Sequence, residues 1–146
     1  MRSATALLAV SAALAGCGGG DSEGKRLSSA EYRRQADAIC AKANADLRAL
    51  EPPDSLAAMK DFVDDAKPIA QRAVDDLDEL EPPQQLEQAH ERWVEQNRHI
   101  VELLDELTEQ QLPGVASNAR EFDRVTKQTN ETARDDLALD ECGAEG

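Results

Sequence analysis

Aromatic residues are scarce in this sequence: Phe, Trp and Tyr together make up 3% of its 146 residues. A hydrophobic core must therefore be built mainly from Leu, Ala, Val and Ile side chains. The sequence also lacks any stretch in which apolar and polar residues alternate with a period of two, so no β-strand is expected. Together these two absences favour an all-α fold.

Positive charge is also in short supply, with 16 Lys and Arg against 30 Asp and Glu and a formal net charge of −14. The basic residues form no cluster anywhere along the chain. A polyanion of this kind is repelled by nucleic-acid phosphates and by anionic lipid headgroups. We therefore expect no nucleic-acid partner, and we interpret the acidity as a solvated surface.

The sequence lacks the motifs of metal, cofactor and catalytic sites. Its two histidines, His90 and His99, fall nine residues apart on one expected helix, so they point to opposite faces and cannot share a metal. The Glu87-x-x-His90 pattern has no second copy, which a di-iron bundle requires. No Gly-rich phosphate loop or nucleophile motif is present. We predict no metal, no cofactor and no enzymatic activity.

The N-terminus has the order of an export signal. Arg2 precedes an apolar run, Ala4 to Leu14, which is too short to span a bilayer. The next residues complete the tetrad Leu14-Ala15-Gly16-Cys17, which resembles the lipobox of bacterial lipoproteins. That resemblance implies a diacylglyceryl group on the Cys17 thiol and cleavage just before it. The alternative is an ordinary secretory signal in which Cys17 is incidental.

These features divide the chain into three parts. We expect a signal peptide at 1–16, a lipid-attachment cysteine and flexible tether at 17–27, and a folded domain at 28–146. The run 18–25 is rich in glycine and has no apolar residue that could pack, which is typical of a flexible linker. The expected location is the extracytoplasmic face of the cell membrane, with the membrane contacted through the N-terminal lipid.

One ten-residue pattern occurs twice in the expected domain. Residues 47–56 and 77–86 share L-x-x-L-E-P-P-x-x-L. A Pro-Pro pair disfavours helix in the residue before it and is suited to the start of a new helix. These joints, with a weaker one near Pro113, divide the domain into four segments of helical periodicity. The first segment opens with a capping box formed by Ser28 and Glu31.

Four amphipathic segments joined by short turns predict an up-down-up-down four-helix bundle. The fourth segment is expected to run to about Leu137, and Pro68 to kink the second. The alternative is an extended helical array without a closed core. Monomers are expected in either case.

The remaining cysteines favour the closed bundle. With Cys17 lipidated, Cys40 in the first helix and Cys142 in the C-terminal tail form one pair, and an exported chain can keep a disulfide. The first and fourth helices are neighbours in the predicted bundle, so the tail can reach Cys40. The alternative is two reduced, unrelated cysteines.

A wider resemblance concerns the domain itself. The stretch 36–44, the Pro-Pro joints and the terminal Glu141-Cys142-Gly143 are similar to small helical lipoproteins of actinobacterial-type bacteria. The resemblance implies the fold and the anchor, and that group implies no assigned activity.

Two residues of the third segment are candidates for a binding site. His90 and Trp93 fall on its apolar stripe and could line a ligand pocket between helices, although core packing explains both as well. Asn97 falls on the same stripe, where a polar residue can fix helix register. We rank three functions in this order: an interaction module with a cell-envelope protein partner, a small-ligand binding protein, and an envelope enzyme.

Overall fold

The computed structural model describes residues 26–109 and 112–143, so the predicted signal peptide, Cys17 and most of the tether lie outside the described residues. Within these ranges the chain is helical and has no strand, as predicted. Its four α-helices are α1 (Ser29–Arg48), α2 (Leu56–Asp78), α3 (Glu87–Glu109) and α4 (Leu112–Glu131). A 3₁₀ turn at Gln84–Leu86 precedes α3, and a π-helical turn at Thr132–Asp136 follows α4.

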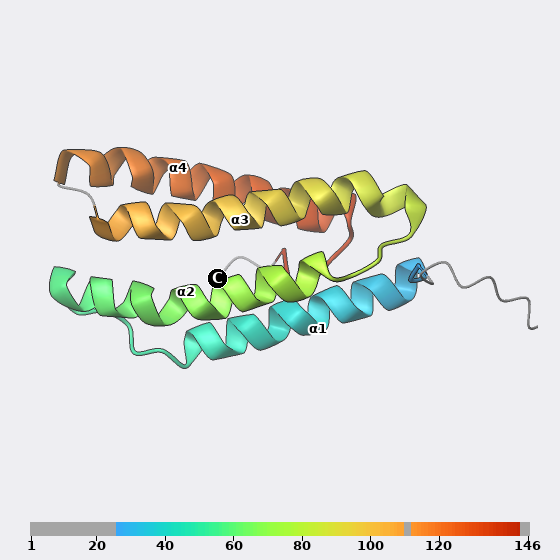
Figure 1. Ribbon diagram of the computed structural model, residues 1–146, viewed down its shortest axis with the longest axis horizontal. Coiled ribbons are helices and arrows are strands. Elements are labelled where there is room, and N and C mark those ends of the chain that lie inside the picture. The colour runs from blue at the N-terminus through green and yellow to red at the C-terminus, as the bar shows by residue number, and fades with distance from the viewer. Residues whose placement is uncertain (1–25, 110–111, 144–146) are drawn as a thin grey trace, which may run out of the picture.

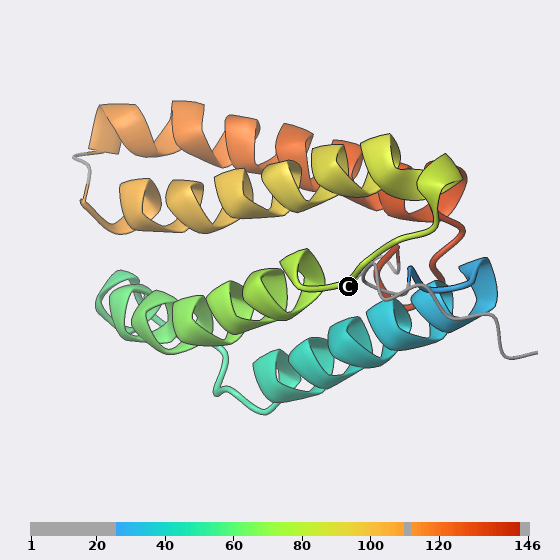
Figure 2. The same ribbon diagram turned by 45° about the vertical axis from the view of Figure 1, so that its right-hand side comes forward.

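Successive helices run in opposite directions, as an up-down-up-down order requires (Figure 1). In the described residues α1 packs against α2, α2 against α3 and α3 against α4, but α1 and α4 have no extensive contact. The expectation that α1 and α4 are neighbours was therefore wrong. The C-terminal tail, residues 137–143, passes between α1 and the α3–α4 pair instead (Figure 2).

The helices begin where local sequence provides caps. Ser28 Oγ accepts a hydrogen bond from the Glu31 backbone N–H at 3.3 Å, and the Glu31 carboxylate accepts one from the Ser28 N–H at 3.0 Å. This is the predicted capping box, which satisfies two N–H groups that the helix leaves unpaired. Ser55 caps α2 through the Ala58 N–H at 3.1 Å. Helix α2 continues through Pro68 to its end, so the proline does not terminate it.

The core combines apolar side chains from the helices and from the tail. Leu137 and Leu139 of the tail are fully buried and belong to the same core cluster as side chains of the helices. The tail therefore completes the core, a role that the sequence analysis had not given it. The buried cluster comprises Tyr32, Ala36, Val74, Leu77, Trp93, Val94, Val101, Ala133, Leu137 and Leu139.

A disulfide joins the tail to α1, as predicted. The Cys40 and Cys142 sulfurs are 2.05 Å apart and the Cα atoms 5.2 Å apart. Three hydrogen bonds reinforce the attachment. Arg33 Nε donates to the Leu137 carbonyl at 3.2 Å, the Glu141 N–H donates to the Asp37 carboxylate at 2.9 Å, and Asn44 Nδ2 donates to the Glu141 carbonyl at 3.1 Å. These residues lie along one side of α1, so the tail is held over most of that helix.

The end of the fourth helical segment changes its hydrogen-bond pattern. The α-helix ends at Glu131, and a contiguous π-helical turn, Thr132–Asp136, carries the helical segment to the residue before Leu137, about where the sequence pattern ends it. Ala138 then has a φ of 54°, in the left-handed region. The chain reverses there because the tail must return along α1 to bring Cys142 to Cys40.

No described helix combines the length and apolar character needed to cross a membrane.

Candidate functional site

A hollow in the surface lies at the second Pro-Pro joint, where the chain passes from α2 to α3. We call it the joint groove; it has a volume of about 620 Å³ and is open to solvent. The start of α1, the end of α2 and the start of α3 meet at this end of the molecule (Figure 1). The groove is lined by Arg26, Asp78, Leu80, Glu81, Pro82, Glu87, His90 and Glu91.

The residues just before α1 hold the joint in place. The Leu27 N–H donates to the Glu81 carbonyl at 2.9 Å, and Arg26 Nη1 donates to the Pro82 carbonyl at 3.3 Å. Arg26 Nη2 also pairs with the Glu87 carboxylate at 3.0 Å. These two carbonyls are free to accept hydrogen bonds because the joint is not helical. The prolines lack an N–H and prevent α2 from continuing through the joint. The groove therefore has one wall built from residues more than fifty positions away.

His90 forms the inner part of the groove, with 5% of its surface exposed. Its Nδ1 lies 2.9 Å from the Tyr32 hydroxyl of α1, and the two rings meet edge to face at 5.5 Å. Tyr32 is fully buried, and its hydroxyl has no other partner among the described residues. A buried hydroxyl proton without an acceptor is costly, so the Tyr32 O–H donates to Nδ1.

This hydrogen bond determines the tautomer of His90. A neutral ring that accepts at Nδ1 carries its proton on Nε2. Burial lowers the pKa of His90, while the nearby Asp78 and Glu91 carboxylates oppose that shift, so the ring is neutral at neutral pH. In the described structure Nε2 has no partner, yet it is not sealed from solvent. His90 lines the groove, and its Nε2–H is left as a hydrogen-bond donor that no described residue engages.

Around this donor the groove is acidic, with four carboxylates and one guanidinium. Two carboxylates are already engaged: Glu87 by Arg26 at 3.0 Å, and Asp78 by Arg98 at 2.6 Å. Glu81 and Glu91 are exposed, and their carboxylates make no hydrogen bond or ion pair in the described structure. The groove thus carries unbalanced negative charge beside a neutral donor.

The two residues predicted to share a ligand pocket are separated by the structure. His90 lines the joint groove, but Trp93 is 1% exposed, belongs to the core and is not among the groove residues. The indole Nε1 of Trp93 is buried without a partner among the described residues. Asn97 does not bond to another helix: its Nδ2 donates to the Trp93 carbonyl one turn earlier in α3, at 2.9 Å.

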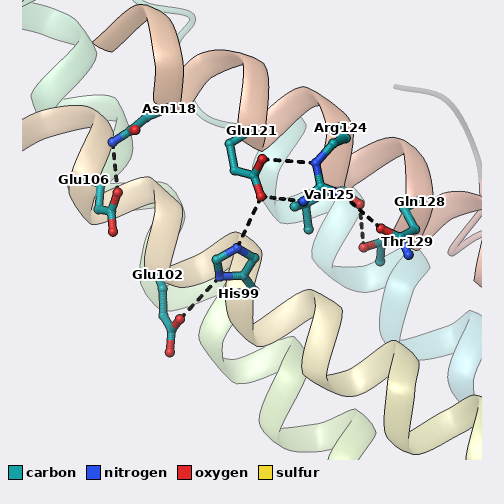
Figure 3. Close-up of polar contacts among 9 residues, drawn as sticks. All are labelled: His99, Glu102, Glu106, Asn118, Glu121, Arg124, Val125, Gln128 and Thr129. Carbon is teal, nitrogen blue, oxygen red and sulfur yellow. Dashed lines mark hydrogen bonds and ion pairs between the residues drawn. The ribbon is translucent and has the colours of Figure 1, made fainter. Parts of the chain in front are cut away.

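His99 faces away from His90, as their spacing predicts, and belongs to a polar contact between α3 and α4 (Figure 3). Its Nδ1 lies 3.5 Å from Glu102 and its Nε2 lies 3.9 Å from Glu121. Arg124 pairs with Glu121 through two nitrogens, and this hydrogen bonding lowers the pKa of Glu121. The group is largely exposed, so its contribution to stability is small.

A second groove, of about 380 Å³, lies at the first Pro-Pro joint. It is also acidic, but the described residues that line it include neither a histidine nor a basic side chain. These residues are Leu50, Glu51, Pro52, Pro53, Asp54, Ala58, Asp61, Phe62 and Asp65. Nowhere in the described ranges do three or more His, Cys, Asp or Glu side chains converge in a way that could hold a metal.

Sequence reasoning found His90 but missed Arg26, Tyr32, Glu81 and Glu91. A partial signal was present, since Tyr32 and His90 both lie on apolar stripes and a buried histidine needs a polar partner. Comparisons with protein-family models, curated proteins and solved structures give no match to this chain. Interpretation of the site therefore depends on its own geometry.

Proposed function

We propose that this protein is a non-catalytic binding module, anchored by lipid on Cys17 at the extracytoplasmic face of the cell membrane. The observation that carries the binding role is the joint groove, an open acidic hollow with a buried histidine donor at its inner end. The lipobox-like tetrad before residue 18 supports the anchor, because it places a cysteine directly after small residues and an apolar run.

The partners of the chemically reactive side chains favour binding over catalysis. Ser28 and Ser55 cap helices, and Cys40 is bonded to Cys142. The Nδ1 atom of His90, which would act as a base, accepts from a buried tyrosine. These groups have structural partners, whereas two carboxylates of the groove, those of Glu81 and Glu91, make no hydrogen bond or ion pair in the described structure.

The anchor and the groove are close along the chain. Arg26 lines the groove, and Cys17 lies nine positions before it. Nine extended residues span roughly 30 Å. A lipid on Cys17 would therefore hold the joint groove near the membrane surface, within reach of membrane proteins or of solutes close to the bilayer.

The anchor is tested by Cys17→Ser in a bacterium that processes lipoproteins. We expect the wild-type chain to partition into the detergent phase and the variant to leave it, either as uncleaved precursor in the membrane or as exported soluble protein, with loss of the acyl mass in both cases. Ser22→Ala changes the tether and keeps the cysteine, so it serves as the matched control and should remain acylated. Acyl mass that persists after Cys17→Ser would contradict the proposal.

A further inference from the structure

We propose that the joint groove binds a cationic group, an ammonium or a guanidinium, whose carrier also offers a hydrogen-bond acceptor to the Nε2–H of His90. This inference deepens the proposed binding function and specifies the chemistry of its ligand. It depends on the geometry of the groove and on two carboxylates that have no partner in the described structure.

The charge of the groove selects a cation. After Arg26 and Arg98 have neutralised Glu87 and Asp78, Glu81 and Glu91 remain unpaired. Charges on groove walls act together on a ligand, because the field adds inside a concave surface with a low-dielectric wall. An anionic ligand would meet like charge, so phosphates and carboxylates are excluded as the primary contact.

The groove already shows how a guanidinium fits there. Arg26 places one nitrogen 3.0 Å from the Glu87 carboxylate and another 3.3 Å from the Pro82 carbonyl. A planar guanidinium has several N–H groups, so it can form an ion pair with a carboxylate and a hydrogen bond to a carbonyl at the same time. Glu81 and Glu91 lie on the same two segments, the joint and α3, and offer carboxylate acceptors to a ligand cation.

His90 adds the second requirement. His90 lines the groove and is more than nine-tenths buried, its Nδ1 is fixed by Tyr32, and its Nε2–H has no partner among the described residues. A simple metal ion or a bare alkylammonium cannot accept a hydrogen bond from this donor. The ligand that satisfies both features is a cation with a nearby carbonyl or hydroxyl oxygen, such as a Lys or Arg residue in a peptide or a small amine that bears an oxygen.

The test uses the purified chain in a non-ionic detergent and follows its two imidazoles by NMR. Nα-acetyl-arginine amide supplies both the cation and the acceptor, butylammonium supplies the cation alone, and Nα-acetyl-leucine amide supplies the acceptor alone. We expect the arginine derivative to shift the His90 signal saturably and to bind more tightly than either partial probe. His99 lies on the opposite face of α3 and is the internal reference.

Matched variants distinguish binding in the joint groove from a general effect of the negative charge of the protein. Glu91→Gln and Glu81→Gln should each weaken binding of the arginine derivative about fivefold, which is typical of losing one partly exposed ion pair. Asp123→Asn removes the same charge from the exposed surface of α4 and should change affinity less than twofold. Equal effects of Glu91→Gln and Asp123→Asn would overturn the proposal, as would a shift of His99 in place of His90 or equally tight binding of the leucine derivative.

Two further arms identify the source of the cation. Free arginine carries an α-carboxylate that the groove should repel, so a site for protein side chains should prefer the blocked derivative. Tighter binding of ethanolamine than of the blocked derivative would indicate a small amine instead. Both results support the shared chemistry. The binding assay does not depend on Cys17, so its failure would leave the anchor intact, and failure of the Cys17→Ser experiment would leave the groove intact.

Discussion

The two Pro-Pro joints have the same sequence pattern and very different surroundings. Pro82 and Pro83 of the second joint are buried, whereas Pro52 of the first is exposed and Pro53 half-buried. The segment before α1 bonds to the second joint, and the tail returns at the same end of the molecule (Figure 2). A shared local pattern therefore specifies a turn, while distant parts of the chain decide whether that turn becomes part of the core.

The difference also explains why the grooves beside the joints are unequal. Both are acidic, because each joint carries the Glu of the repeat and lies beside acidic helix positions. The joint groove alone gains Arg26 from the N-terminal segment and a histidine fixed by Tyr32. A functional site forms where the repeat meets long-range contacts.

The largest expected effect comes from releasing the tail, which lies at the same end of the molecule as the second joint. Cys40→Ser with Cys142→Ser opens a loop with a sequence separation of 102. In the loop-entropy model this lowers the free energy of unfolding by about 4 kcal/mol. Urea denaturation of the oxidised wild type and the double variant measures it.

Hydrogen exchange on the same two proteins locates the effect. We expect the amides of Tyr32 and Ala36, which share a buried cluster with Leu137 and Leu139 of the tail, to lose protection. The amides of Val63 and Ala66, which directly follow residues that line the groove at the first joint, should lose less. Wild-type protein under reducing conditions should match the double variant. Unchanged stability in the absence of the bridge would show that the tail packs without it.

The two joints can be compared directly by replacing the prolines of each with alanine and measuring the free energy of unfolding. Pro82→Ala with Pro83→Ala removes buried surface and frees the unfolded chain, and it should cost about 2 kcal/mol of unfolding free energy. The corresponding change of Pro52 and Pro53 should cost less than about 1 kcal/mol, since it affects mainly the unfolded state. Urea midpoints measure both, and equal losses would contradict the difference between the joints.

Local signals in the sequence identified the helices and several of their boundaries. The Ser28 and Glu31 pair fixes the start of α1 through contacts three residues apart, and the structure confirms it. The Cys40–Cys142 bridge was also predicted, although the assumed contact between α1 and α4 was wrong. The pairing followed from chemistry and redox context, so it did not depend on the exact neighbour of α1.

The rest could not be predicted because it arises from tertiary contacts. Nothing near Leu137 in sequence indicates that the chain turns back after the helical segment and fills the core. Arg26 was assigned to a flexible tether on composition, yet it bonds to Pro82, 56 positions away. The groove is built from segments that are distant in the sequence. Sequence periodicity therefore identified His90 on the apolar stripe of α3 and could not identify the groove residues from other segments.

The smallest expected effect tests the His90–Tyr32 contact, which the first joint lacks. Burial holds the pKa of His90 below its ordinary value of 6.5 against the opposing Asp78 and Glu91 carboxylates. Below about pH 6.5 the unfolded chain therefore binds a proton that the folded chain does not, and stability falls as the pH decreases. The loss is at most about 1.4 kcal/mol for each pH unit below that value. Urea midpoints of the wild type and of His90→Gln between pH 7.5 and 5.5 measure it. The variant should be less stable at pH 7.5 and should change less with pH, because the glutamine amide cannot titrate. A wild type and variant with parallel pH profiles would show that His90 is not held neutral by its burial.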